Sequence, residues 1–466
     1  MKKRNKRLLS MALAAMLMGG LPFSYTCTEA ADRNAAQAQV KDPAPDADGF
    51  VARVHPVEPQ QKLQMKDLRL PKTMKLVDAK ATPATAGLAA FLHGVAKSPY
   101  VLYGHQNDVL HKSGQASKNP SDTYDDVGDY AAVAGVDFQA LHHGDFELTP
   151  EEEKAGMTLT EKMARICEEG ASHGIIFTAA AHMPNFNVIA KRGQDANGHW
   201  DFSGYSTPVT EGDVVARILP GGDLNACYRA YLDQMAALGQ RLDKSNIPLI
   251  VRLFHEADGG WFWWGEGHCT PAQYKQLFRY TVHYLRDVKG VHNFLYAYSP
   301  GGPVTSEAAY RELYPGDAFV DLVGFDMYHR DVAKKDSFMQ EMDASVKVLT
   351  DFAEKHGKIA ALTETGLLGE KGALPKTGNV RKKWFSELEQ VLEKHPVSYV
   401  LIWSNDNAQT YFEPFMVDKV RGHEMINEFI DFYNEPGTIF ASQVPDYRAI
   451  QAHREGNSWV VDTEKE

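Results

Sequence analysis

Two glutamates in this chain of 466 residues are placed as a pair of carboxylates for acid–base chemistry. Glu256 comes just after the apolar run 248–253, and Glu364 comes just after the apolar run 359–362. Hydrolysis of a glycosidic bond needs one carboxylic acid to protonate the leaving oxygen and one carboxylate to act as the nucleophile or to activate water. A separation of about 5–5.5 Å gives retention of configuration and roughly 6.5–9.5 Å gives inversion, so the residues alone leave both outcomes open.

An aromatic cluster follows the first of these glutamates. The segment Trp261-Phe262-Trp263-Trp264 stands where a polar loop would be expected, and Trp403 ends another apolar run. Aromatic faces stack on the C–H faces of sugar rings, so these residues favour a carbohydrate ligand. We expect two of the four clustered aromatics to serve the core. Taken singly, each glutamate could instead tie down a neighbouring loop.

Metal binding is the main rival chemistry, because several histidines lie near the ends of apolar runs. His142, His143 and His182 could coordinate zinc, and His255-Glu256 has the form of half a metalloprotease motif. However, position 259 is Gly, so the second histidine of His-Glu-x-x-His is absent. No Gly-x-Ser-x-Gly elbow for a serine nucleophile occurs either. We therefore predict no metal and no cofactor, with a metallohydrolase as the weaker alternative.

The elements that must position these residues are short apolar runs separated by longer amphipathic segments. Eight candidate strands lie at 100–103, 137–141, 175–181, 248–253, 294–298, 322–325, 359–362 and 399–403. Candidate crossover helices lie at 159–173, 228–242, 271–289, 336–356 and 380–395. This alternation predicts an α/β fold, a single (β/α)₈ TIM barrel with long loops after its strands. A doubly wound sheet is the alternative, but the Gly-rich turn typical of it is missing.

The ends of the predicted strands are rich in polar residues. In a barrel of this kind the carboxyl ends of the strands form the active site. Seven of the eight runs lead into polar residues, among them Gln106, His182, Glu256, Tyr328 and Glu364. One such residue would be explained by a structural role, but seven strand ends together indicate a functional site. The segment 185–219 shows no clear helix, and we expect a long loop there.

Together these residues resemble glycoside hydrolase family 26. The resemblance spans about 76–444 and is carried by Arg252-Leu253-Phe254-His255-Glu256, Gly259, Trp261 to Gly265, Gly104-His105-Gln106, Asp326-Met327-Tyr328, Glu364 and Trp403. That family consists mainly of β-mannanases. The resemblance implies a retaining double displacement on a (β/α)₈ barrel, with mannan, glucomannan or galactomannan, or their oligosaccharides, as the substrate. The mode of cleavage, internal or mannobiose-releasing, stays open.

The resemblance also implies a role for each matching residue. Glu256 would be the general acid/base, with its pKa raised by its surroundings, and Glu364 would be the nucleophile, held charged by its hydrogen-bond donors. Six further residues would bind substrate or order the catalytic pair: His182, Arg252, His255, Trp261, Tyr328 and Trp403.

Two departures from the family pattern concern the neighbouring subsites. Ala257-Asp258 stands where the pattern has an Asn, and His182 is followed by Met183-Pro184. Family members that act on xylan or mixed-linkage β-glucan therefore remain an alternative. A non-catalytic carbohydrate-binding barrel is a second alternative, although such a protein would have no reason to keep both Glu256 and Glu364.

Composition limits the partners. With Lys+Arg 49 against Asp+Glu 61 the net charge is −12, which argues against binding to nucleic acid. The basic start and the apolar stretch 8–21 predict a secretory signal peptide over 1–30, although Cys27 leaves a lipoprotein open. We expect a periplasmic or secreted monomer with no transmembrane span. The predicted organisation is a linker or arm at 31–75, a catalytic barrel at 76–450 and a tail at 451–466.

Overall fold

The computed structural model of the protein describes residues 43–142, 145–368, 374–406 and 411–462. The predicted signal peptide with Cys27, the first part of the predicted arm, and His143 lie outside the described residues. Among the described residues, no helix has both the length and the apolar character needed to cross a bilayer.

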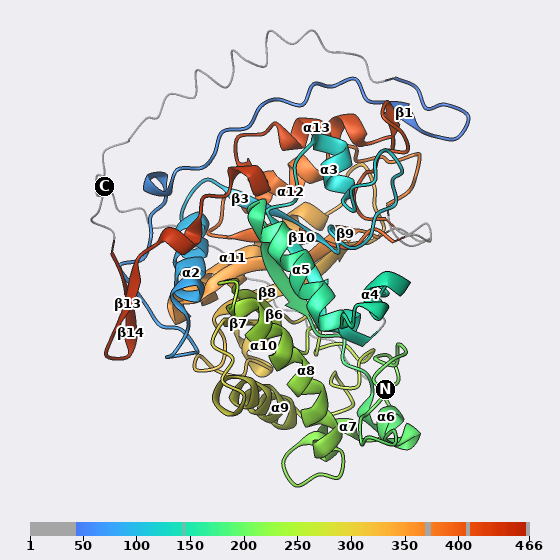
Figure 1. The fold of residues 1–466 in the computed structure, drawn as a ribbon. Coiled ribbons are helices and arrows are strands. Elements are labelled where there is room, and N and C mark those ends of the chain that lie inside the picture. Colours follow the sequence, from blue (N-terminus) through green and yellow to red (C-terminus); the bar gives the residue numbers. More distant parts are fainter. Residues whose placement is uncertain (1–42, 143–144, 369–373, 407–410, 463–466) are drawn as a thin grey trace, which may run out of the picture. The chain divides into compact units, whose positions relative to one another are not determined.

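Eight parallel strands close a barrel, as the alternation of runs predicted (Figure 1). Each strand pairs with the next along the chain, and the last pairs with the first, with Ile402 opposite His105. The strands are β3 (Val101–Gln106), β4 (Val133–Asp137), β5 (Ile176–Ala180), β6 (Leu249–Arg252), β7 (Phe294–Tyr298), β8 (Leu322–His329), β9 (Ile359–Leu367) and β10 (Tyr399–Ile402). A short strand, β12 (Thr438–Ile439), pairs alongside the start of β3.

Helices connect and cover these strands. They are α3 (Asp122–Val127), α4 (Pro150–Lys154), α5 (Leu159–Ser172), α8 (Asn225–Asp243), α9 (Pro271–His283), α10 (Glu307–Glu312), α11 (Phe338–His356), α12 (Trp384–Leu392) and α13 (Ile426–Tyr433). Local sequence sets several of the ends: Thr270 caps α9 with Pro271 in its first turn, and Gly357 ends α11 in the left-handed conformation. One further helix, α2 (Pro83–Ala96), packs its apolar side chains against the apolar starts of the barrel strands, among them Leu102 and Ile359.

The second strand lies four residues earlier than predicted. The run 137–141 is not a strand, because β4 ends at Asp137 and a 3₁₀ helix, Phe138–His142, follows it. Ala134 and Gly135 in the middle of β4 are small, and such residues give a weak strand signal. A glycine is needed at position 135, since a Cβ there would lie 1.9 Å from the side chain of Gln106. The shift places Asp137 at the carboxyl end of its strand.

The predicted loop 185–219 contains two short helices, α6 (Phe186–Arg192) and α7 (Val214–Ile218), so the expectation of no helix was wrong. Asn185 explains much of the local order. Its side chain accepts hydrogen bonds from the backbone at the start of α6, and its amide donates to the carbonyl groups of Val209 and Glu211. Helices this short depend on such tertiary contacts rather than on a periodic sequence.

Segments from both ends of the described chain join the barrel domain. β1 (Val51–Ala52) pairs with β11 (Arg421–Gly422). β2 (Thr73–Met74) adds a third strand to the hairpin formed by β13 (Ala452–Glu455) and β14 (Ser458–Val461).

Candidate active site

A bulge in β9 aims Glu364 into the mouth of the barrel. Pairing between β8 and β9 shifts by one residue, so that Phe325 faces Leu362 but Asp326 faces Glu364. Bulges next to a site commonly redirect a side chain in this way. The extra residue is Thr363, whose hydroxyl donates to Asp326 at 2.8 Å. The two carboxylates therefore stand side by side at the strand ends.

A tight turn after β6 brings in Glu256. Phe254 and Glu256 both have positive φ values, 47° and 51°, which non-glycine residues seldom adopt. The backbone N–H of Glu256 donates to the carbonyl of Ser299 at 2.9 Å, which holds the turn against the end of β7. Backbone strain of this kind is tolerated where a side chain must be held in one place.

These elements create an active-site cluster of Arg252, Glu256, Asp326 and Glu364. One carboxylate oxygen from each of the three acids lies within 4.8 Å of the others. The buried guanidinium of Arg252 donates to Glu364 at 2.6 Å and to Asp326 at 2.7 Å. The hydroxyl of Tyr328 donates to the other oxygen of Glu364. These donors stabilise Glu364 as a charged carboxylate.

Glu256 has a different environment. Its carboxylate is partly exposed and accepts a hydrogen bond of 2.8 Å from Nε1 of Trp261, whose side chain is 52% exposed. Burial, followed by the charge of Glu364, raises the pKa of Glu256 to about 7. At neutral pH this group therefore holds its proton in a substantial fraction of molecules, as a general acid requires.

Two histidines line the same cluster. The rings of His182 and His255 lie 4.5 Å apart, centre to centre. Nδ1 of His182 lies 2.5 Å from the carboxylate of Asp137, so Nδ1 carries a proton. Burial lowers the pKa of His255 well below its ordinary value, and the charges of Arg252 and His182 add to this, so His255 is neutral.

The aromatic cluster is more buried than expected. Trp263 and Trp264 are fully buried and Phe262 nearly so, which makes three core residues rather than two. Nε1 of Trp264 donates to the carbonyl of His255 at 2.9 Å, so this tryptophan supports the backbone of the site. The ring of Trp403 lies edge-on to that of His182, with 6.1 Å between the ring centres.

All eight residues predicted for the site are connected through these contacts. The sequence analysis missed Asp137, because the second strand was set too late and Asp137 then stood at its start rather than its end. It also left Asp326 without a role of its own, although this carboxylate is one of the two ion-pair partners of Arg252.

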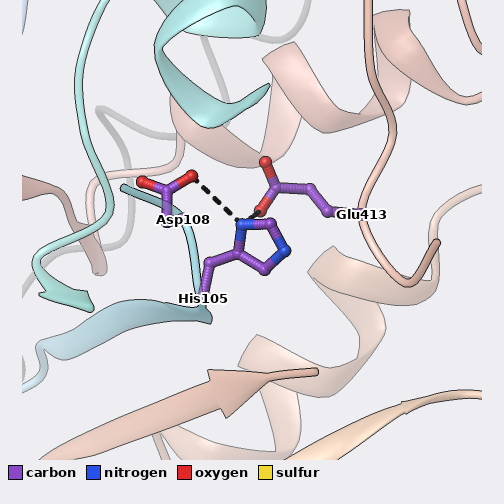
Figure 2. A group of neighbouring side chains, drawn as sticks. All are labelled: His105, Asp108 and Glu413. Carbon is purple, nitrogen blue, oxygen red and sulfur yellow. Dashed lines mark hydrogen bonds and ion pairs between the residues drawn. The ribbon is translucent and has the colours of Figure 1, made fainter. Parts of the chain in front are cut away.

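Two groups of described residues have the close spacing of metal ligands: the active-site acids, and a buried set of His105, Asp108 and Glu413 (Figure 2). In the first group the guanidinium of Arg252 already provides the positive charge between two of the acids. In the second, hydroxyl groups donate to the carboxylate oxygens, as described below. Among the described residues, neither group includes His142 or His182, which the zinc alternative required.

Comparison with known proteins points in one direction. The model of glycosyl hydrolase family 26 matches residues 77–401. A mannan endo-1,4-β-mannosidase of Bifidobacterium adolescentis is 34% identical over 358 residues, which cover 73% of this chain and 33% of that protein. The chain thus spans about a third of the length of this curated relative.

Solved structures show the same likeness. The catalytic domain of a family 26 endo-β-1,4-mannanase from Bacillus sp. JAMB-750 superposes with a TM-score of 0.71 at 31% identity, over 82% of this chain and 98% of that one. A modular endo-β-1,4-mannanase from Cellulomonas fimi gives 0.68 at 32% identity, over 81% and 80% of the two chains.

Proposed function

The chain belongs to glycosyl hydrolase family 26, and on this premise we propose that it hydrolyses the β-1,4-mannosidic bonds of mannan, glucomannan or galactomannan with retention of configuration. The observation that carries the mechanism is the short separation of Glu256 and Glu364, which have carboxylate oxygens within 4.8 Å of each other. Retaining glycosidases hold their two carboxyl groups about 5–5.5 Å apart, whereas inverting enzymes need room for a water molecule. The names of the relatives above support mannan as the substrate.

In the first step the carboxylate of Glu364 attacks the anomeric carbon and the bond to the leaving oxygen breaks. Glu256 gives its proton to that oxygen, so the leaving sugar departs as a neutral alcohol. Arg252 and Tyr328 hold Glu364 by one oxygen each. This fixes the direction of attack and keeps the nucleophile ionised until the covalent bond forms.

In the second step a water molecule replaces the leaving sugar beside Glu256. Loss of the negative charge on Glu364 in the ester removes one cause of the raised pKa of Glu256. Glu256 has just lost its proton and now accepts one from the water, which attacks the anomeric carbon and releases Glu364. One carboxyl group thus serves both steps, first as an acid and then as a base.

The remaining predicted residues are placed to bind the sugar. Asp137 holds Nδ1 of His182 at 2.5 Å, which leaves Nε2 for a sugar hydroxyl. The exposed indole of Trp261 and the half-buried one of Trp403 offer faces for stacking. Such faces suit a neutral polysaccharide, for which the acidic net charge is no obstacle.

The experiment that tests this function compares initial rates on β-mannan, glucomannan, xylan and mixed-linkage β-glucan. We expect hydrolysis of the mannans and loss of it in Glu364→Ala. Glu266→Gln, an exposed glutamate in the loop after Glu256, is the matched control and should keep full activity. Rates on xylan or β-glucan as high as those on the mannans would contradict the proposed preference for mannan. Activity retained in Glu364→Ala would exclude Glu364 as the nucleophile.

We further propose that the protein is exported through the leader at 1–30 to the periplasm or the medium. The support is the order of basic, apolar and small residues in the sequence. Sequencing the mature N-terminus should find Ala31. An acylated Cys27 would instead make the protein a lipoprotein, and an intact Met1 in the fractionated cytoplasm would contradict export.

A further inference from the structure

A second set of ionisable side chains, His105, Asp108 and Glu413, is buried inside the barrel domain. We call it the His105 cluster. Its members come from the end of β3, the turn after it, and the segment that follows β10, where the barrel closes (Figure 2). All three side chains are fully buried. Nδ1 of His105 lies 3.1 Å from Asp108 and 3.3 Å from Glu413.

Hydroxyl groups complete the cluster. Ser121 donates to Asp108 at 2.8 Å, and Tyr103 donates to Glu413. The hydroxyl oxygen of Thr123 lies 2.8 Å from both Asp108 and Glu413. A hydroxyl has only one hydrogen, so both contacts are hydrogen bonds only when one carboxyl is protonated. Burial raises the pKa of Glu413 to about 7, so near neutral pH Glu413 carries this proton in part of the molecules and is charged in the rest.

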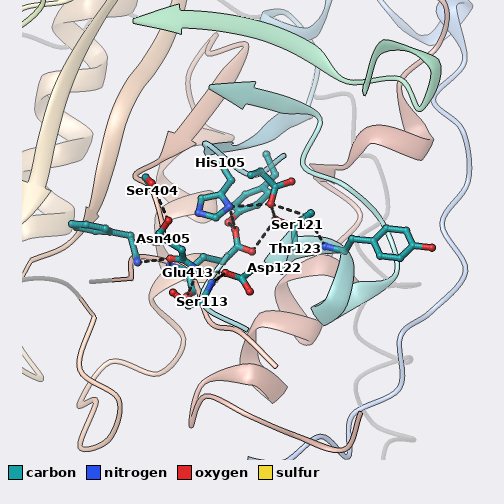
Figure 3. A network of polar contacts seen from close by, with 12 residues as sticks. His105, Ser113, Ser121, Asp122, Thr123, Ser404, Asn405 and Glu413 are labelled. Atoms are coloured by element: carbon teal, nitrogen blue, oxygen red, sulfur yellow. Dashed lines mark hydrogen bonds and ion pairs between the residues drawn. The ribbon is translucent and has the colours of Figure 1, made fainter. Parts of the chain in front are cut away.

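The cluster continues into the backbone of the segment after β10 (Figure 3). The backbone N–H groups of Phe412 and Glu413 donate to the side-chain oxygen of Asn405 at 2.8 and 3.0 Å. The amide of Asn405 donates in turn to Asp122 at 2.8 Å. Phe412 is therefore held from two sides: through its own backbone, and through the side chain of the next residue.

Phe412 connects this network to the active site. Its side chain is buried, and its ring packs edge-on against the ring of Tyr328, with 5.6 Å between centres. The close approach needs a glycine in β9, since a Cβ on Gly366 would lie 2.4 Å from the ring of Phe412. Tyr328 is the residue whose hydroxyl donates to Glu364.

We propose that the His105 cluster is a positioning device for the nucleophile: by fixing Phe412 behind Tyr328, it keeps the tyrosine hydroxyl on Glu364. The inference rests on the proposed function only in taking Glu364 as the nucleophile. His105, Asp108 and Glu413 are positioning residues in this scheme, because they act through Phe412 and Tyr328. Loosening the cluster should lower kcat and leave KM nearly unchanged, since no sugar-binding residue moves.

A double-mutant cycle tests the connection. Phe412→Leu should lower kcat about tenfold in the wild-type background, within the range of couplings between contacting residues. In a Tyr328→Phe background, where the donated hydrogen bond is already lost, the same substitution should change kcat less than twofold. Equal losses in the two backgrounds would overturn the proposal, because they would mean that Phe412 does not act through Tyr328.

The matched control is Phe415→Leu. Phe415 lies in the same segment and is as buried as Phe412, but its ring contacts are with Phe50, Tyr411 and His423. It should change kcat by the same factor in both backgrounds. Glu413→Gln should reproduce the loss of kcat seen with Phe412→Leu; a folded Glu413→Gln enzyme with wild-type kcat would exclude the cluster from the device.

A crystal structure of Phe412→Leu separates this inference from the proposed function, because it needs no substrate. The tyrosine hydroxyl should lie beyond hydrogen-bond distance of Glu364. An unchanged hydrogen bond would contradict the inference even if mannan is hydrolysed. Conversely, a wild-type enzyme that is inactive on mannan would refute mannan as the substrate. The crystal structure of Phe412→Leu would still show whether Phe412 positions the hydroxyl of Tyr328.

Discussion

Two groups of acids, each around one basic side chain, lie at the strand ends of this barrel: the active-site cluster and the His105 cluster. They differ mainly in whether a substrate can reach them. Each contains a glutamate whose pKa burial raises to about 7, Glu256 in one and Glu413 in the other. Glu256 is partly exposed beside an exposed tryptophan, whereas Glu413 is fully buried. A perturbed pKa therefore marks a functional site only where a substrate can reach the group.

The largest effect is expected from Glu364→Ala. This change removes the group that forms the covalent bond to the sugar, so kcat on mannan should fall by roughly 10⁴-fold or more. Initial rates on β-mannan provide the measurement. An equally large loss of kcat in Glu413→Gln would contradict the distinction between the two clusters. A buried group that no substrate reaches would then matter as much as the nucleophile.

Glu256→Gln should come next, with a loss of about 10²–10⁴-fold on mannan, the usual contribution of a general acid. The loss should be much smaller on an aryl mannoside, since a good leaving group departs without a proton. Comparing kcat on the two substrates measures the difference. If both rates fall equally, Glu256 is not the acid.

Besides the loss of kcat expected from any change that loosens the His105 cluster, His105→Gln should have an effect on stability that depends on pH. Burial alone would lower the pKa of His105, but Glu413 and Asp108 outweigh it and raise the pKa to about 9. The protonated ring then stabilises the fold fully below about pH 6.5, and this stabilisation, on the order of 1–3 kcal/mol, is lost as the pH rises through 9.

Thermal unfolding of the wild type and His105→Gln from pH 6 to 9.5 measures this effect. The gap in Tm between the two proteins should narrow as the pH rises. Exposed His199→Gln is the control and should track the wild type throughout. A constant gap would mean that the ring of His105 is not charged in the folded protein.

The smallest effect is expected from Trp261→Phe. In the wild type kcat/KM should fall as the pH rises through about 7, because Glu256 then loses its proton. The hydrogen bond from Trp261 lowers the pKa of Glu256, so its loss should move this basic limb upward by about half a pH unit. The pH profile of kcat/KM gives the answer; a downward shift would contradict the assigned contact. Trp403→Phe, without such a contact, should leave the limb in place.

Sequence reasoning reached the barrel because seven of its strands are clear apolar runs, and six of these seven runs lead into the polar residues that were predicted. It failed at β4, where position 135 must be glycine to admit the side chain of Gln106, a requirement that comes from packing and not from local pattern. That error hid Asp137. It also could not foresee the bulge at Thr363 that turns Glu364 toward Asp326.

The sequence predicted the active-site cluster but not the His105 cluster, and the reason again lies in the tertiary structure. The residues of the active-site cluster stand at or near the carboxyl ends of β6, β8 and β9, so the shared edge of the barrel predicts that they meet. The His105 cluster instead joins the end of the first strand with Glu413, from the segment after the last strand, and with Thr123 of a helix. No spacing in the sequence connects His105 to Glu413, and only the closure of the barrel brings them together.

The measurement that tests the central claim most directly is the configuration of the product first released from a β-1,4-manno-oligosaccharide, followed by ¹H NMR before mutarotation. The short distance between Glu256 and Glu364 predicts that the β anomer appears first and the α anomer grows in later. An α anomer at the earliest times would mean direct attack by water, and would contradict the assignment of Glu364 as a covalent nucleophile.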